Sequence, residues 1–98
     1  MPGSNWVQEF WNLLCWFYQQ IGRDCANLPK PLPDAAQSLY DKYQDERPPT
    51  FANEQERLAF RGKLDELEAM LDDEACTLDQ ATKNLILAFI EQARADSN

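Results

Sequence analysis

Hydrophobic residues in the first third of the chain recur with the period of an α-helix. Placed at the angular spacing of a helix, those between positions 6 and 21 fall within an arc of roughly 200°. They are Trp6, Val7, Phe10, Trp11, Leu13, Leu14, Cys15, Phe17, Tyr18 and Ile21. One neighbouring helix is too narrow to cover such an arc. We therefore predict a helix over residues 6–25 that lies at the centre of a small bundle, forms an interface with another protein, or does both.

Trp16 departs from this pattern. It lies in the middle of the polar arc of the same helix, which otherwise carries Gln8, Glu9, Asn12, Gln19, Gln20 and Arg23. Surfaces that bind partners use exposed tryptophan and wide apolar faces as anchors. Trp16 is therefore a candidate partner-binding residue. The core of such a small protein is not expected to cover the whole apolar arc of this helix. Three of the residues expected to remain uncovered are further candidates, namely Trp6, Trp11 and Tyr18.

Proline separates the first helix from a shorter second one. Pro29, Pro31 and Pro33 cannot continue a helix, so residues 27–34 are expected to form a semi-rigid connector. The second helix is predicted over residues 35–46. Its apolar stripe is narrow and consists of Ala36, Leu39, Tyr40 and Tyr43. We expect this helix at the edge of the bundle, with its tyrosine hydroxyls reaching water or a polar partner.

Two further helices are expected after a second proline stop. The third is predicted over residues 54–74, with Asn53 as its N-cap, and its hydrophobic residues recur at spacings of three and four. They are Phe60, Leu64, Leu67, Leu71 and Ala75. The fourth is predicted over residues 78–95, because Thr77 and Gln80 have the spacing of a capping box. The short link between these two helices predicts an antiparallel hairpin.

These elements predict an all-α fold for a single domain spanning residues 1–98. The architecture is a small irregular four-helix bundle, with the proline-rich connector between the first two helices and the hairpin formed by the last two. Three stripes are expected to form the core. They are Phe10, Leu14, Phe17 and Ile21 from the first helix, Phe60, Leu64, Leu67 and Leu71 from the third, and Leu85, Ile86 and Phe89 from the fourth.

Acidic residues outnumber basic ones by 17 to 9, which gives a net charge of -8. This charge repels phosphate backbones and anionic lipids, so neither direct nucleic-acid binding nor membrane binding is expected. It favours a partner with a basic surface. The densest acidic run is Asp65, Glu66, Glu68, Asp72, Asp73, Glu74 and Asp79. Negative charge near a helix C-terminus is unfavourable, which gives weight to a binding role for Asp65, Glu68, Asp72 and Asp73.

The cysteines and the absence of histidine limit the chemistry of the chain. Cys15, Cys25 and Cys76 are odd in number and lack CxxC spacing, so we expect three reduced thiols and, by default, a cytoplasmic protein. The N-terminus does not resemble a signal peptide. Without histidine, the usual general base, nucleophile activator and zinc ligand are missing. We therefore expect no enzyme, no metal and no cofactor.

Three functions remain compatible with these patterns. The first is a non-catalytic module that masks a surface of a partner protein, such as a small inhibitor, antiactivator or adaptor of bacterial or phage type. The second is an acidic nucleic-acid mimic that blocks the basic groove of a nucleic-acid-binding protein. The third is a structural homodimer or a subunit of a larger assembly. The surplus apolar surface of the first helix also favours a homodimer for the masking module.

Overall fold

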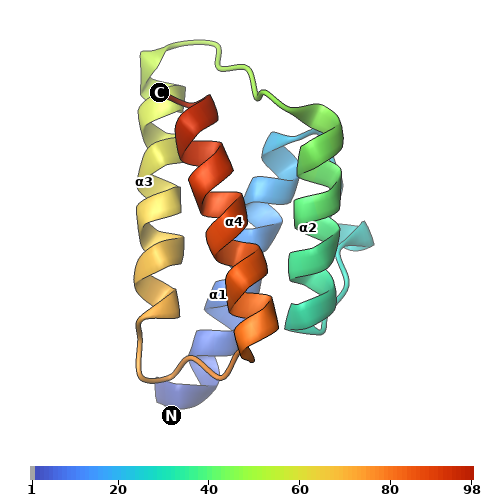
Figure 1. Ribbon diagram of the computed structural model, residues 1–98, viewed down its shortest axis with the longest axis vertical. Coiled ribbons are helices and arrows are strands. Elements are labelled where there is room, and N and C mark those ends of the chain that lie inside the picture. The colour runs from blue at the N-terminus through green and yellow to red at the C-terminus, as the bar shows by residue number, and fades with distance from the viewer. Residues whose placement is uncertain (1) are drawn as a thin grey trace.

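A computed structural model describes the backbone of residues 2–98 and the side chains of residues 5–98. The chain forms four helices, α1 (Pro2–Gln20), α2 (Leu32–Glu46), α3 (Glu54–Leu71) and α4 (Gln80–Asp96), and a short 3-10 turn, η1 (Cys25–Asn27). They pack into a bundle that measures 38 × 23 × 22 Å (Figure 1). The predicted all-α four-helix bundle is confirmed.

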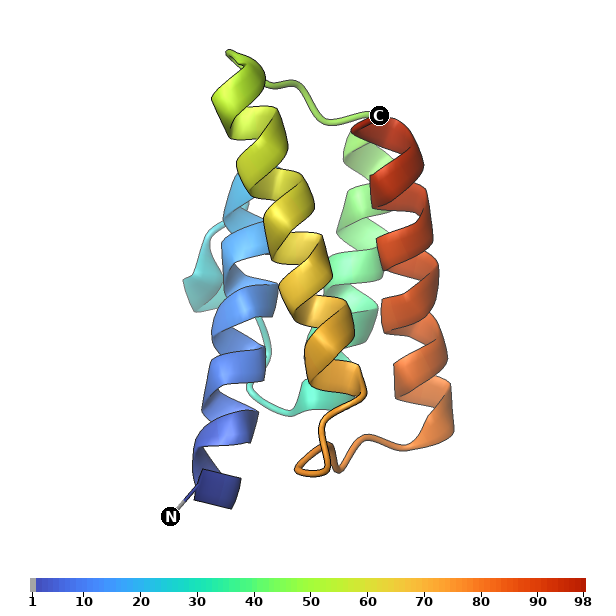
Figure 2. The ribbon, with the colours of Figure 1, turned by 90° about the vertical axis from the view of Figure 1, so that its left-hand side faces the viewer.

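The connector between α1 and α2 reverses the path of the chain. It returns along the outside of α1, so that α1, α2 and α4 run in one direction and α3 runs in the other (Figures 1 and 2). The predicted antiparallel hairpin of α3 and α4 is therefore confirmed. The two helices on either side of the connector are parallel, because the connector spans the length of the bundle.

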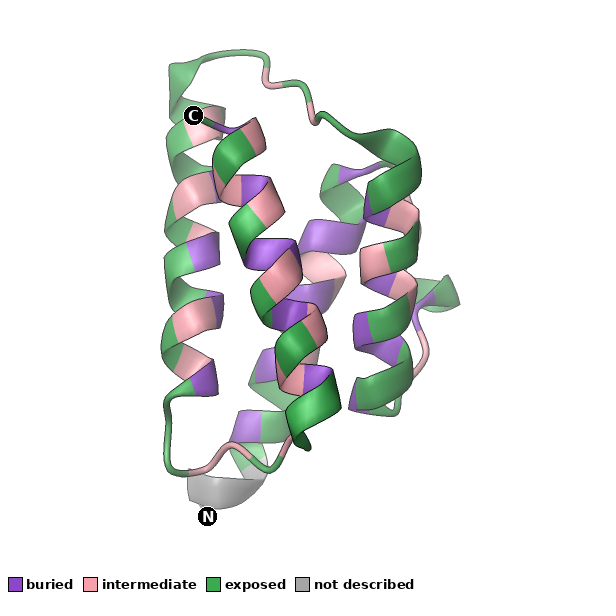
Figure 3. Ribbon diagram, in the orientation of Figure 1, coloured by how far each residue is buried: buried purple, intermediate pink, exposed green. Residues whose placement is uncertain are grey.

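Each of the four helices contributes an aromatic ring to a cluster in the core. The ring of Phe17 on α1 meets those of Phe60 on α3 and Phe89 on α4 edge to face, with centroids 5.4 and 5.2 Å apart. Tyr43 of α2 packs on Phe89 in the same way, at 5.0 Å. Figure 3 shows the buried residues on the sides of the helices that face one another. All the predicted core residues are buried except Leu85, which is half-buried.

Helix α1 ends earlier than the predicted boundary at residue 25. Its last residue is Gln20, and Gly22 follows with a φ of 79°. The backbone N–H of Arg23 donates to the carbonyl oxygen of Tyr18 at 3.0 Å, which closes the end of the helix. A left-handed glycine is a common helix stop, because glycine adopts this conformation without steric cost. This turn directs the chain back along α1.

Helix α2 buries one face against α1 and α4, and the prediction that it packs loosely at the edge of the bundle is wrong. It begins at Leu32, three residues before the predicted start, with Pro33 in its first turn, where proline is tolerated. Ala35, Leu39 and Tyr43 are fully buried. A narrow stripe therefore suffices to bury one face of α2 against its two neighbours, α1 and α4.

The link between α3 and α4 is longer than predicted. Helix α3 ends at Leu71 and α4 begins at Gln80, with Asp79 as its N-cap residue. The predicted capping box at Thr77 is therefore wrong. At the start of α3 the predicted cap is confirmed, because the side-chain oxygen of Asn53 accepts from the backbone N–H of Glu56 at 2.9 Å.

Two of the three expected reduced thiols form a disulfide instead. Cys15 of α1 and Cys25 of η1 are bonded, with their Cα atoms 5.3 Å apart, whereas Cys76 is free and partly buried. The turn at Gly22 brings the two cysteines together, which their spacing in the sequence did not reveal. Reduced thiols therefore no longer support a cytoplasmic location. In the described residues, no helix is both long enough and apolar enough to cross a membrane.

A polar cluster joins the C-terminal ends of α2 and α4. The hydroxyl of Tyr43 donates to a carboxylate oxygen of Asp96 at 2.5 Å, and Arg47 donates to both oxygens of this carboxylate at 2.7 and 3.1 Å. Burial, followed by the bond to Asp96, raises the pKa of Tyr43 well above its ordinary value. The hydrogen bonds from Arg47 hold the pKa of Asp96 below its ordinary value of 3.8, and the bond from Tyr43 adds to this effect.

Replacing Asp96 by asparagine should lower the free energy of unfolding by about 2 kcal/mol at neutral pH, because charged hydrogen bonds are lost. A depressed pKa stabilises the fold at pH values above the ordinary value of 3.8, and this contribution is lost as the pH falls through the folded value. The difference between the native chain and the variant should therefore shrink in acid. Urea unfolding over a pH series measures it. Asp45→Asn, an exposed change on α2, is the control, and an equal loss of stability in the control would contradict the prediction.

Candidate partner-binding groove

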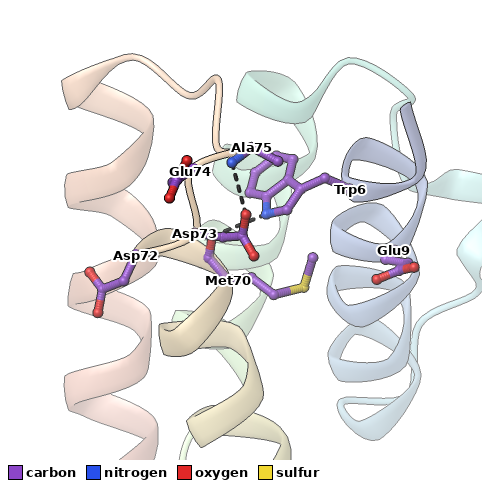
Figure 4. A pocket seen from close by; sticks show the side chains of 7 residues that line it. All are labelled: Trp6, Glu9, Met70, Asp72, Asp73, Glu74 and Ala75. Atoms are coloured by element: carbon purple, nitrogen blue, oxygen red, sulfur yellow. Dashed lines mark hydrogen bonds between the residues drawn. The ribbon is translucent and has the colours of Figure 1, made fainter. Parts of the chain in front are cut away.

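A groove lies between α1 and α3, which run side by side (Figure 2). At one end is a hollow of about 270 Å³, whose lining includes Leu13 and Trp16 of α1 and Met70 of α3. Towards the α3–α4 link it widens into a second hollow of about 660 Å³ (Figure 4). Glu9 and Met70 line both hollows, so the two form one continuous surface. We call this surface the α1–α3 groove.

Trp16 lies at the first hollow and is half-buried. Its ring centroid is 5.0 Å from that of Phe17 and 6.2 Å from that of Phe60. The ammonium of Lys63 lies 5.8 Å from the same ring. Helix α3 approaches α1 from the side of the polar arc, so a tryptophan on this side contacts α3. Trp16 is neither fully exposed nor core, and part of its ring stays available to a partner.

Trp6 forms part of the wider hollow and holds the end of α3. Its indole N–H donates to the carbonyl oxygen of Met70 at 3.1 Å (Figure 4). Its ring stacks on that of Phe10 with the centroids 4.8 Å apart, and only 4% of the residue is exposed. Carbonyl groups in the last turn of a helix lack the usual intrahelical partners, and that of Met70 accepts from Trp6 as well as from the backbone N–H of Asp73, at 3.3 Å. The expectation that Trp6 is left uncovered is therefore wrong.

Trp11 and Tyr18 lie away from the groove and are covered by other parts of the chain. The indole N–H of Trp11 donates to the carbonyl oxygen of Pro29 at 2.8 Å, and the ammonium of Lys30 lies 4.0 Å from the ring. Tyr18 is 2% exposed and its hydroxyl bonds that of Ser38 at 3.0 Å. The returning connector covers Trp11 and α2 covers Tyr18, so a partner reaches neither ring fully without displacing them.

The first half of the acidic run is paired with basic residues of the same chain. Arg94 of α4 donates to the carboxylates of Asp65 and Glu68 at 2.8 and 2.7 Å. These bonds, that to Glu68 first, raise the pKa of Arg94 above its ordinary value. Glu66 pairs with Lys63 one turn earlier on α3, at 3.6 Å. Asp65 and Glu68 therefore connect α3 to α4 rather than lining the groove.

The second half of the run lies at the wider end of the groove. Asp72, Asp73 and Glu74 form part of its rim with Glu9 of α1 (Figure 4). Among the described side chains, none of these four carboxylates has a basic partner within ion-pair distance. Within the described part of the chain, Asp73 accepts only the backbone N–H of Ala75, at 2.8 Å. The described residues therefore leave the negative charge at this end of the groove uncompensated.

The structure divides the predicted binding residues into two sets. Four of them line the groove, namely Trp6, Trp16, Asp72 and Asp73, and the other four lie elsewhere. The sequence reasoning missed Glu9, Leu13 and Met70. A signal existed for the first two, since Trp6, Glu9, Leu13 and Trp16 recur at spacings of three and four and so share one face of a helix.

The groove has the chemistry of a binding surface. Its lining combines aromatic and thioether groups with carboxylates, and the chain has no histidine. Within the part of the chain that the structure describes, no three cysteine or carboxylate side chains are grouped to hold a metal ion. Comparison with protein families, curated proteins and solved structures finds no match for the chain.

Proposed function

We propose that this chain is a non-catalytic protein-binding module, of the inhibitor, antiactivator or adaptor kind, that masks a surface of a partner protein through the α1–α3 groove. The observation that carries this proposal is the half-buried Trp16 beside Leu13 and Met70 in a hollow between two packed helices. Tryptophan and methionine are enriched at the cores of interfaces, and tryptophan is among the commonest hot spots.

The packing around Trp16 supports this role. Contacts with Phe17 and Phe60 hold the ring in place before any partner arrives. Binding to an ordered ring costs less side-chain entropy than binding to a mobile one. The partner would then act as a lid over the groove, and the chain would exclude other ligands from the partner surface that it covers.

Ion pairs and charge argue against the other two functions. A nucleic-acid mimic needs an extended track of free acidic groups, whereas Asp65 and Glu68 are paired with Arg94. The free carboxylates gather at one end of the groove. A homodimer joined groove to groove with these ends together would bring two such clusters into contact, which like-charge repulsion disfavours. A homodimer through another surface remains a prediction for sedimentation to test.

Trp16→Glu should abolish retention of the partner in a tagged pull-down from lysate of the source cell or its host. Loss of a hot-spot side chain typically costs about 2 kcal/mol or more, which weakens binding roughly 30-fold. Leu87→Glu is the matched control, because Leu87 is 43% exposed on α4 and lies outside the groove. Mass spectrometry identifies the retained protein, and circular dichroism verifies that both variants are folded.

Two results would contradict the proposal. Equal retention by the native chain and Trp16→Glu would show that the groove is not the binding surface. Equal loss with Leu87→Glu, in a folded protein, would show that binding depends on the general charge or on another face.

A further inference from the structure

The length of the α1–α3 groove matches a short helix. Trp6 and Trp16 mark its two ends on α1, and ten residues of helix span about 15 Å. A helix of about three turns has this length and presents an apolar stripe at positions i, i+3 or i+4, and i+7. The apolar lining of the groove, which includes Leu13 and Met70, lies between these ends.

The two ends of the groove differ in charge. Lys63 lies near Trp16 and pairs with Glu66, so this end is close to neutral. At the other end, the unpaired carboxylates are joined by the C-terminus of α3, whose dipole adds negative potential. The groove thus combines an apolar stretch around Leu13, Trp16 and Met70 with one strongly negative end.

The negative charge at one end of the groove determines which kind of molecule can bind there. A neutral apolar segment would remove water from the carboxylates of Glu9 and Asp73 without replacing their hydrogen bonds, which is costly. A second copy of this chain has a net charge of -8 and would be repelled by these carboxylates, as would nucleic acid or anionic lipid. A segment with arginine or lysine at one end would form charge-assisted hydrogen bonds there instead.

We infer that the α1–α3 groove binds a basic amphipathic helix of a partner protein. Its apolar stripe lies over Trp16 and Met70, and its arginines or lysines face Glu9 and Asp73. This inference rests on the proposed function, because it names the partner surface that the module masks. A basic partner also explains an asymmetry in the acidic run. The carboxylates in its first half form ion pairs within the chain, whereas those in its second half do not.

The probe is a synthetic helical peptide of about three turns, with a leucine stripe and arginines at one end. Its twin carries citrulline in place of each arginine, which keeps the shape and removes the charge. The readout is the three tryptophan indole N–H signals of the labelled protein in NMR. Trp6 reports the negative end and Trp16 the apolar end. Trp11, which donates to Pro29 outside the groove, is the internal control.

The arginine peptide should shift the signals of Trp6 and Trp16 and leave that of Trp11 in place. It should bind about tenfold or more tightly than the citrulline peptide, and this advantage should fall as salt rises from about 50 to 200 mM. In Asp73→Asn/Glu74→Gln the advantage should be lost. The amide oxygen introduced at position 73 would still accept the bond from the backbone N–H of Ala75, so the turn is preserved. Asp41→Asn/Asp45→Asn removes the same charge from α2 and should change nothing.

Three results would overturn the inference, and each is separable from failure of the proposed function. If the two peptides bound with equal affinity and both shifted the indole signal of Trp16, the groove would bind apolar helices without regard to their charge. The masking function would then stand. A shift of Trp11 as large as that of Trp6 would show non-specific attraction. No shift of Trp6 or Trp16 with either peptide would exclude a helical occupant, and the pull-down with Trp16→Glu would still decide the proposed function.

Discussion

Phe17→Ala will lower the free energy of unfolding by about 4 kcal/mol, the largest effect expected of any single substitution considered for this chain. The side chain is 1% exposed and touches aromatic rings on both α3 and α4. Its removal leaves a cavity where the helices meet and also loses edge-to-face contacts. Because a domain of this size has only about 5–15 kcal/mol of stability, the variant should be only marginally stable.

The measurement is urea unfolding of the native chain, Phe17→Ala and Phe51→Ala, followed by circular dichroism. Phe51 also packs on Phe60, with centroids 5.1 Å apart, but it is half-buried in the loop before α3. The same substitution should therefore cost much less there. If the two variants lost equal stability, the aromatic cluster around Phe17 would not be the centre of the core.

Removing the disulfide will cost about 3 kcal/mol, the second largest effect, because the bond restricts the conformations open to the unfolded chain. Cys15 and Cys25 are 10 residues apart, and closing a loop of this length accounts for a cost of about this size. Urea unfolding with and without a reducing agent measures the loss. The double variant Cys15→Ala/Cys25→Ala should have the stability of the reduced chain and should not respond to reductant.

Cys76→Ala is the matched control, because Cys76 is free. This variant should respond to the reducing agent as the native chain does. A thiol titration of the unreduced, denatured native chain should find one thiol, and three thiols would contradict the disulfide. The disulfide lies beside the connector that covers Trp11, so reduction should also shift the indole signal of Trp11 more than that of Trp16.

The stability of the bundle and the proposed function depend on different sides of α1. The side that carries Phe10, Leu14 and Phe17 is fully buried in the core. The side that carries Glu9 and Trp16 lines the groove. Substitutions on the first side should strongly destabilise the fold, whereas those on the second should weaken binding at a smaller cost in stability. This separation makes the groove testable by mutation in a folded protein.

Local patterns in the sequence determined the fold class and most of the core. The stripe of Phe60, Leu64, Leu67 and Leu71 and the stripe of Phe10, Leu14 and Phe17 identify helices, because the period of 3.6 residues is a property of the backbone alone. Asn53 marked the start of α3 for the same reason, since a cap depends only on the next few residues. Helix ends were less accurate where a turn, such as that at Gly22, redirected the chain.

The tertiary structure alone decided which of these residues are available to a partner. Trp6, Trp11 and Tyr18 are covered by α3, the connector and α2, whose positions depend on packing between distant segments. The pairing of Arg94 with Asp65 and Glu68 joins two helices across 26 and 29 residues. Composition revealed the excess of acidic residues, but only the packing of α3 against α4 and α1 shows which carboxylates are neutralised and which remain free at the end of the groove. Coverage and charge compensation depend on neighbours in space, and a sequence pattern reports only neighbours along the chain.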